Sequence, residues 1–334
     1  MLGLGGTLST EDISSRNVAH TQQNAVMDIL DSLKTVYTYR ELQQLGMSSS
    51  VIARRVRQQE LARLIPGVYT TQSNFRQLPH YQQYPYFISA VYKKNPQTVF
   101  THQTAAWLHG FAVVDQKLVD VQCHPSSRGR AQGIAKHYSY TALDTTSAHG
   151  LFHLTTRLRT LADCCRYLHP SSALVTVESA LYQGACTVEE IAEYLRGQRG
   201  RGVQKMRTVA GLMSSSSESA GESKLKWVLH MSPLPLPAQQ VDVWVDNEHF
   251  RLDFAYENEM IALEFDGRVK YLDTQSRDEV FFNEVRREKL LKNAGWDVLR
   301  YDWSTVVHHP QRIVREVLAT MQRKNGNSRI TALR

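Results

Sequence analysis

Three carboxylates stand in or at the ends of two short apolar stretches, and their type and spacing make them the best candidates for chemistry in this chain. Asp253 lies in the stretch Leu252–Ala255, whereas Glu264 and Asp266 end the stretch Ile261–Phe265. A carboxylate in an apolar strand is costly to bury unless it is hydrogen-bonded, paired or bound to a cation. Cross-strand neighbours in a hairpin lie about 5 Å apart, so paired strands would bring these groups together at a site that suits Mg²⁺. The alternative is that the acids mark strand ends and that Asp266 begins a turn.

The elements that would position these acids follow a serine-rich stretch. The sequence predicts a helix, three strands, a helix, a strand and a closing helix, at residues 222–231, 241–245, 250–255, 261–265, 276–294, 296–301 and 305–322. Gly295 ends the long basic helix. The polar residues 246–249 would connect the first two strands as a hairpin.

A second set of candidate residues is basic and lies near the N-terminus. An amphipathic helix comes first. Thr38 and Glu41 then form an S/T-x-x-E capping box that begins a short helix, and Gly46 ends that helix. Ser48 or Ser49 then offers the N-cap of another helix. A strand, a Pro-Gly turn and a second strand follow, so this order predicts a helix-turn-helix with a β wing.

In that arrangement the second short helix would enter a major groove of double-stranded DNA. The candidates for base edges are Ser49, Ser50, Arg54 and Arg55, and those for phosphates are Arg57 and Arg63. The four arginines face only Glu60 within residues 48–63, although the seven basic and six acidic residues of positions 1–75 nearly cancel. The alternative is a winged helix for protein contacts, with its arginines on a solvated face.

Composition sets wider bounds on function. The chain has 334 residues, 42% hydrophobic residues and a net charge of +7, with a pI of about 9.2, which favours a polyanionic partner. A second basic run, residues 196–207, has five basic residues and no acid, and either a solvated face or nucleic-acid contact would explain it. No apolar run is long enough to span a membrane, the N-terminus lacks the features of a signal peptide, and the four cysteines lack metal or disulfide spacing. We therefore expect a cytoplasmic protein with free thiols.

The length favours several domains. We expect an unstructured N-terminus (1–22), a winged helix-turn-helix domain (23–75), an α+β middle domain (76–212), a flexible Ser/Gly linker (213–221), a mixed-sheet α/β domain (222–323) and a tail (324–334). The fold class is therefore α+β. In the middle domain, His102 and His109 have no third ligand nearby in the sequence, which favours structural roles. No Gly-rich phosphate loop, nucleophile elbow or Walker motif occurs there.

The C-terminal order, with an acid in the first helix, Asp in the second strand and Glu in the third, resembles the PD-(D/E)XK nuclease fold. More closely, it is similar to the very-short-patch-repair-like endonuclease domain common in actinobacterial proteins, through ESAGES (218–223), RLDF (251–254), ALEFDG (262–267), VRRE (285–288) and GWDVLR (295–300). The N-terminal part resembles the winged helix of AbiEi-type antitoxins through RRVRQQELARLIPGVYT. The segments THQTAAWLHG and LTTRLRTLADCCR are similar to stretches that follow it in that family.

The nuclease resemblance implies that Glu222, Asp253 and Glu264 hold Mg²⁺, with Asp266 contributing. The ion would polarise the scissile phosphate and activate a water molecule. By the same resemblance the position two after Glu264 is that of a catalytic lysine, but Asp266 occupies it. Lys270 follows four residues later and would have to reach the site from the next turn.

Three functions follow from these patterns. The first is a DNA-binding regulator of antitoxin type that carries a nuclease-fold domain. The second is an active Mg²⁺-dependent DNA endonuclease in repair or defence. The third is a non-catalytic antitoxin that binds a cognate toxin protein.

Overall fold

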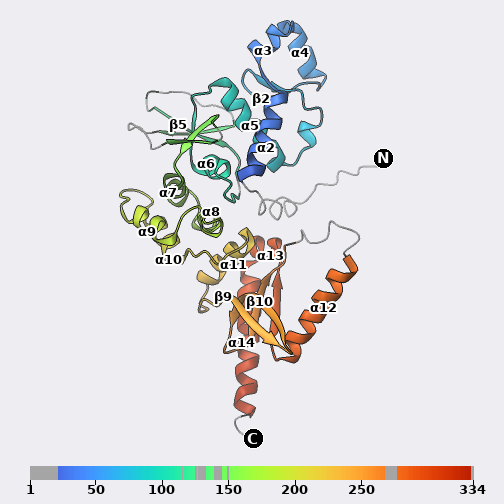
Figure 1. The fold of residues 1–334 in the computed structure, drawn as a ribbon, viewed down its shortest axis with the longest axis vertical. Helices are drawn as coiled ribbons and strands as arrows, with labels where there is room; N and C mark the ends of the chain where they lie inside the picture. Colours follow the sequence, from blue (N-terminus) through green and yellow to red (C-terminus); the bar gives the residue numbers. More distant parts are fainter. Residues whose placement is uncertain are drawn as a thin grey trace. The chain divides into compact units, whose positions relative to one another are not determined.

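The computed structural model describes residues 22–114, 116–124, 126, 133–138, 145–148, 150–267 and 277–331, and the statements below concern these residues. The chain divides into two compact units, with the boundary between Leu212 and Met213, and each is described by itself (Figure 1). Lys270, the expected N-terminal segment before residue 22 and the last three residues of the tail lie outside the described residues.

The N-terminal unit contains helices and strands throughout. They are α2 (Gln22–Thr35), β1 (Val36–Thr38), α3 (Tyr39–Gln44), α4 (Ser49–Arg57), β2 (Ala62–Ile65), β3 (Val68–Thr70), the 3-10 helix η2 (Phe75–Gln77), α5 (His80–Lys94), β4 (Val99–Phe100), α6 (His102–Leu108), β5 (Val119–Cys123), β6 (Ile134–Tyr138), β7 (Thr145–Ala148), β8 (Phe152–Thr155), α7 (Arg157–Tyr167), α8 (Pro170–Tyr182), α9 (Val188–Arg196) and α10 (Val203–Leu212).

Local sequence signals explain how the first part of this unit folds. Thr38 caps α3 by accepting a hydrogen bond from the Glu41 backbone N–H, and the Glu41 carboxylate accepts one from the Thr38 N–H, so the expected capping box is present. Ser48 caps α4. Strand β1 joins the hairpin β2–β3 in an antiparallel sheet of order β1-β3-β2. Leu42, Ile52 and Leu61 form a small core between α3, α4 and the hairpin.

The rest of the unit is a five-stranded mixed sheet with helices packed on it. Its strand order is β6-β5-β4-β8-β7, and the pairs β4–β8 and β5–β6 are parallel. Helix α5 packs against strands of the small sheet and also against β5. The boundary expected near residue 75 therefore falls within one compact unit.

The C-terminal unit is built around a second mixed sheet. Its elements are α11 (Ala220–His230), β9 (Ala238–Val245), β10 (Glu248–Tyr256), β11 (Ile261–Phe265), α12 (Arg277–Asn293), β12 (Asp297–Tyr301), α13 (Trp303–His308) and α14 (Pro310–Thr331). The strand order is β12-β11-β10-β9, with β11 and β12 parallel and the other pairs antiparallel. Helices α11, α13 and α14 cover one face, and α12 covers the other (Figure 1). The expected order of elements from residue 222 to residue 301 is present.

Three details differ from the sequence expectations. The hairpin β9–β10 turns on two residues, Asp246 and Asn247, whose φ values of 49° and 65° are typical of a type I′ turn, rather than on four. The closing helix is divided in two, because Pro310 has no N–H to continue α13, and α14 then runs to Thr331.

The serine-rich segment before α11 is the third difference. Ser217 is buried and accepts a hydrogen bond from the Gln239 side-chain amide at 3.1 Å. Ser214 contacts both Gln239 and Lys226. These contacts differ from the flexible connection that the composition suggested, because small hydroxyl side chains can also satisfy polar groups in a compact segment.

The fold class is thus α+β with mixed sheets. All four cysteines are free thiols, and three of them are buried. Within the described ranges, no helix combines the length and the apolar character needed to cross a bilayer.

Candidate functional site

Helix α4 presents one polar, positively charged face to solvent. Ser50, Ala53, Arg54 and Arg57 are exposed, and their i, i+3, i+4, i+7 spacing places them on the same side of the helix. The opposite side carries Ile52, which is 2% exposed in the small core. The packing of α4 therefore orients the arginines outward.

The other basic candidates of this region differ in their contacts. The Arg55 guanidinium lies 3.6 Å from the Glu60 carboxylate, so part of its charge is neutralised. Ser49 shares a hydrogen bond with the Tyr39 hydroxyl, which ties it to α3. Arg63 is exposed on β2 of the hairpin. The structure therefore places all six predicted DNA-contact residues on α4 or the adjacent hairpin, and it separates the solvent-facing arginines from the partly neutralised Arg55.

The acids predicted for the C-terminal unit lie on neighbouring strands. The register Phe254↔Leu263, extended by one residue, sets Asp253 of β10 opposite Glu264 of β11. The Asp253 carboxylate accepts a hydrogen bond from the Phe265 backbone N–H at 2.9 Å, across the strand boundary. The two strongest sequence candidates are therefore adjacent.

Glu222 extends from helix α11 to Gln240 of β9, the neighbour of Asp253 in the sheet. Gln240, at a position of β9 with φ 52°, lies opposite Asp253 in the β9–β10 register, and its side-chain amide donates to the Glu222 carboxylate at 3.0 Å. That carboxylate also accepts from the Glu218 backbone N–H at 2.9 Å. Ser219 caps the helix, but Glu222 bonds the residue before the cap, so it does not complete a capping box.

A glycine allows α11 to lie this close to the sheet. A Cβ atom at Gly221 would overlap the ring of Phe265 at the end of β11. Only a residue without a side chain leaves room for that ring, so Gly221 sets the position of the first turn of α11, in which Glu222 lies.

Glu264 is already neutralised by arginines of two elements. It is 7% exposed, and one carboxylate oxygen pairs with the Arg287 guanidinium of α12. The other lies 3.5 Å from Nε of Arg300, its direct neighbour in the β11–β12 register. Arg300 also pairs with Glu284 at 2.7 Å, and Arg287 donates to the Arg251 carbonyl at 2.9 Å. A network of charge-assisted bonds therefore holds Glu264.

These contacts bear directly on the expected Mg²⁺ site. Among the residues that the structure describes, no three His, Cys, Asp or Glu side chains are grouped so that they could hold a metal ion. In this geometry Arg287 occupies the carboxylate oxygen of Glu264 that a cation would need. Asp266 is partly exposed, and its backbone N–H donates to the Tyr301 carbonyl at 2.9 Å. The donor set as it stands does not fit Mg²⁺.

Sequence reasoning missed the residues that hold the acids. Arg287 lies within the VRRE motif and Arg300 within GWDVLR, but neither motif shows which acid its arginine contacts. Gln240 carries no sequence signal. All three act through contacts between elements distant in the chain.

Comparison with known proteins finds relatives of low sequence identity over part of the chain. No family model matches the chain. It is 26% identical over 166 residues to two proteins of Mycobacterium tuberculosis, "Uncharacterized protein Rv2248" of strain H37Rv and "Uncharacterized protein MT2308" of strain CDC 1551. The match covers 49% of this chain and 60% of each relative.

Proposed function

We propose that this protein is a DNA-binding regulator that reads double-stranded DNA with helix α4. The order α2, β1, α3, α4, β2, β3 is typical of a winged helix-turn-helix. The observation that carries the proposal is the α4 face of Ser50, Ala53, Arg54 and Arg57, which is exposed while the other side of the helix is packed.

The residues have distinct roles in this proposal. Arg54 and Ser50 contact base edges, because the first turns of a recognition helix enter the groove deepest. Arg57 and Arg63 bind phosphates on either side of the groove, as exposed cations on a helix end and a wing do. Arg55 orients α4 through Glu60 instead of contacting DNA.

The test is duplex binding by fluorescence anisotropy across a range of salt concentrations. Arg54→Ala with Arg57→Ala should weaken binding and reduce the slope of log K against log[salt] by about 0.9, because Arg57 is the phosphate contact of the two and each such contact contributes about 0.9. The matched control is Lys34→Ala with Arg312→Ala, which removes two surface cations already paired with Asp31 and Glu316. Equal binding by the two double variants would refute the proposal.

A second candidate function is phosphodiester hydrolysis by the C-terminal unit, which we propose has a PD-(D/E)XK-type fold. It is favoured by the adjacency of Asp253 and Glu264 and by the link from Glu222 through Gln240. Because the donor set as described does not fit Mg²⁺, this candidate requires Arg287 to leave Glu264 before the acids could hold a cation. Nicking of supercoiled plasmid should then require Mg²⁺ or Mn²⁺ and disappear in Glu264→Ala. Nicking that persists in this variant would refute this candidate.

A further inference from the structure

The basic run at residues 196–207 forms a defined surface at the end of helix α7. Its cationic residues are exposed, and they are Arg196, Arg199, Arg201, Lys205 and Arg207. Within the described part of the chain none of them forms an ion pair with an acidic side chain, whereas the surface residue Lys34 is paired. Five uncompensated charges in twelve residues create a positive potential that attracts a polyanion.

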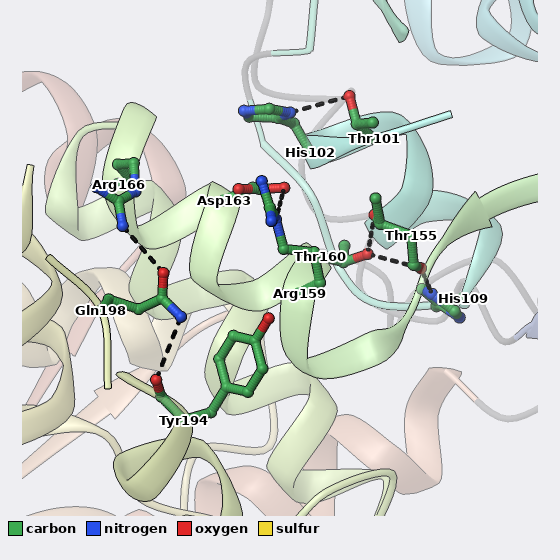
Figure 2. A network of polar contacts seen from close by, with 10 residues as sticks. All are labelled: Thr101, His102, His109, Thr155, Arg159, Thr160, Asp163, Arg166, Tyr194 and Gln198. Carbon is green, nitrogen blue, oxygen red and sulfur yellow. Dashed lines mark hydrogen bonds and ion pairs between the residues drawn. The ribbon is translucent and has the colours of Figure 1, made fainter. Parts of the chain in front are cut away.

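The backbone of this run is held in one conformation by Arg166. One nitrogen of its guanidinium donates to the carbonyls of Arg199 and Arg201 at 2.9 and 2.7 Å. Another donates to the Gln198 side chain at 3.1 Å (Figure 2). Arg166 therefore binds the backbone of the run, and the cationic side chains of the run remain exposed.

Glycine makes this close approach attainable. Gly202 has a φ of 85°, and a Cβ atom there would lie 2.8 Å from the Arg166 carbonyl oxygen. Gly200 has a φ of 86°. Both positions need the left-handed backbone that glycine adopts without strain, so the turn is specifically built.

An exposed aromatic ring lies beside this cationic turn. Tyr167 is 60% exposed. Its neighbours in the chain both contact the basic run, Arg166 through the bonds above and Leu168 through its carbonyl, which accepts from Lys205 Nζ at 3.1 Å. Tyr167 is therefore flanked on both sides by residues that bind the cationic segment.

Two stacked histidines support the Tyr167 ring from within the unit. The rings of His102 and His137 stack with centroids 3.5 Å apart, and the His102 ring lies 4.8 Å from that of Tyr167. Asp120 holds His137 by a hydrogen bond of 2.8 Å, and Thr101 holds His102 at 2.9 Å (Figure 2). Tyr167 is thus an exposed ring whose position is determined by its packing partners.

We propose that Tyr167 and the basic run form a binding surface for single-stranded nucleic acid, separate from the α4 face. Arginine and lysine side chains bind the phosphates of the strand, and an unpaired base stacks on the Tyr167 ring. A groove of cations beside an aromatic platform is the usual architecture for single strands. A duplex keeps its bases stacked within the helix, so it could use the cations but not the ring.

The experiment measures binding of the full chain to labelled oligo-dT, oligo-U and a duplex by fluorescence anisotropy. Arg199→Ala with Arg201→Ala should weaken single-strand binding and reduce its salt slope by about 1.4, since each phosphate contact on a single strand contributes about 0.7. Tyr167→Ala should weaken it roughly 5- to 150-fold, whereas Tyr167→Phe keeps the ring and should bind like the wild type. Tyr182→Ala is the matched control, because Tyr182 is 52% exposed on α8 outside the basic run.

The outcomes separate this surface from the one on α4. Loss of single-strand binding in Arg199→Ala with Arg201→Ala and in Tyr167→Ala, with duplex binding retained, supports the proposal. Failure of the wild type to bind either single strand, or unchanged binding in Arg199→Ala with Arg201→Ala, overturns it. Single-strand binding lost only in Arg54→Ala with Arg57→Ala also overturns it. The arginine variants change exposed side chains and leave the carbonyls on Arg166, so they decide the question even if Tyr167→Ala does not fold.

Discussion

The contact between Arg287 and Glu264 is the one whose removal tells most about the C-terminal unit. Substitution of Arg287 by Ala removes its bonds to Glu264 and to the Arg251 carbonyl. The contact between Glu264 and Arg300, at 3.5 Å, would remain. Its carboxylate would remain in a place where its side chain is 10% exposed.

The expected loss of stability follows from that burial. Removing one partner of a fully buried ion pair costs about 3–5 kcal/mol, and an exposed pair contributes about 0.2–1 kcal/mol. The Arg287 side chain is 27% exposed and Arg300 still compensates part of the charge, so we expect a loss of about 2 kcal/mol in the free energy of unfolding. Arg286→Ala is the matched control from the same helix, because Arg286 is 67% exposed in its pair with Glu248. Its loss should stay below about 1 kcal/mol.

Urea denaturation of Arg287→Ala, Glu264→Gln and the double variant measures the coupling between the two residues. A coupling energy of about 1–2 kcal/mol is expected. Equal effects of Arg287→Ala and Arg286→Ala, with no coupling to Glu264, would refute the inference that Arg287 holds this carboxylate.

The same variants test the cation site. If the acids accept Mg²⁺ once Arg287 is removed, the ion should stabilise Arg287→Ala more than the wild type. An equal response of the two proteins to Mg²⁺ would contradict this expectation.

Three further predictions concern the packing and titration of the fold. Gly221→Ala should destabilise the C-terminal unit by about 1–3 kcal/mol, because its Cβ meets an aromatic ring. Gly211→Ala, in an open helical position, should instead stabilise the protein by up to about 1 kcal/mol. Thermal unfolding of the two variants checks both values. Burial lowers the pKa of His109 to about 4, so the unfolded chain takes up a proton before the folded chain does. The free energy of unfolding should therefore fall by about 3 kcal/mol as the pH drops from the unfolded pKa of about 6.5 toward 4. A His109→Gln variant that keeps the same pH dependence would refute this. Burial raises the pKa of Glu41, but the hydrogen bonds from Lys93 and Thr38 outweigh burial, so the pKa lies below its ordinary value. The stability that Glu41 contributes should therefore be present above its unfolded pKa and be lost as the pH falls through the folded value. Lys93→Ala should reduce that acid sensitivity in a pH titration of unfolding.

Short-range signals let the sequence determine much of the secondary structure. The capping box of Thr38 and Glu41, the Ser48 cap and the glycine stops depend on residues within a few positions of each other, so helices α3 and α4 were predicted where they lie. Two short apolar stretches likewise predicted strands at the positions of β10 and β11. The division of the closing helix at Pro310 was also readable from the sequence, although it was not predicted.

Tertiary packing alone decided what surrounds the candidate residues. Arg287 and Glu264 are 23 positions apart, and Gln240 and Glu222 are 18 apart, so only the arrangement of the sheet and its helices brings them into contact. The sequence by itself named the acids and the exposed arginines, because residue type and periodicity are local properties. Whether an acid is left open to a cation or is neutralised by an arginine depends on which element covers it, and that was decided by the fold.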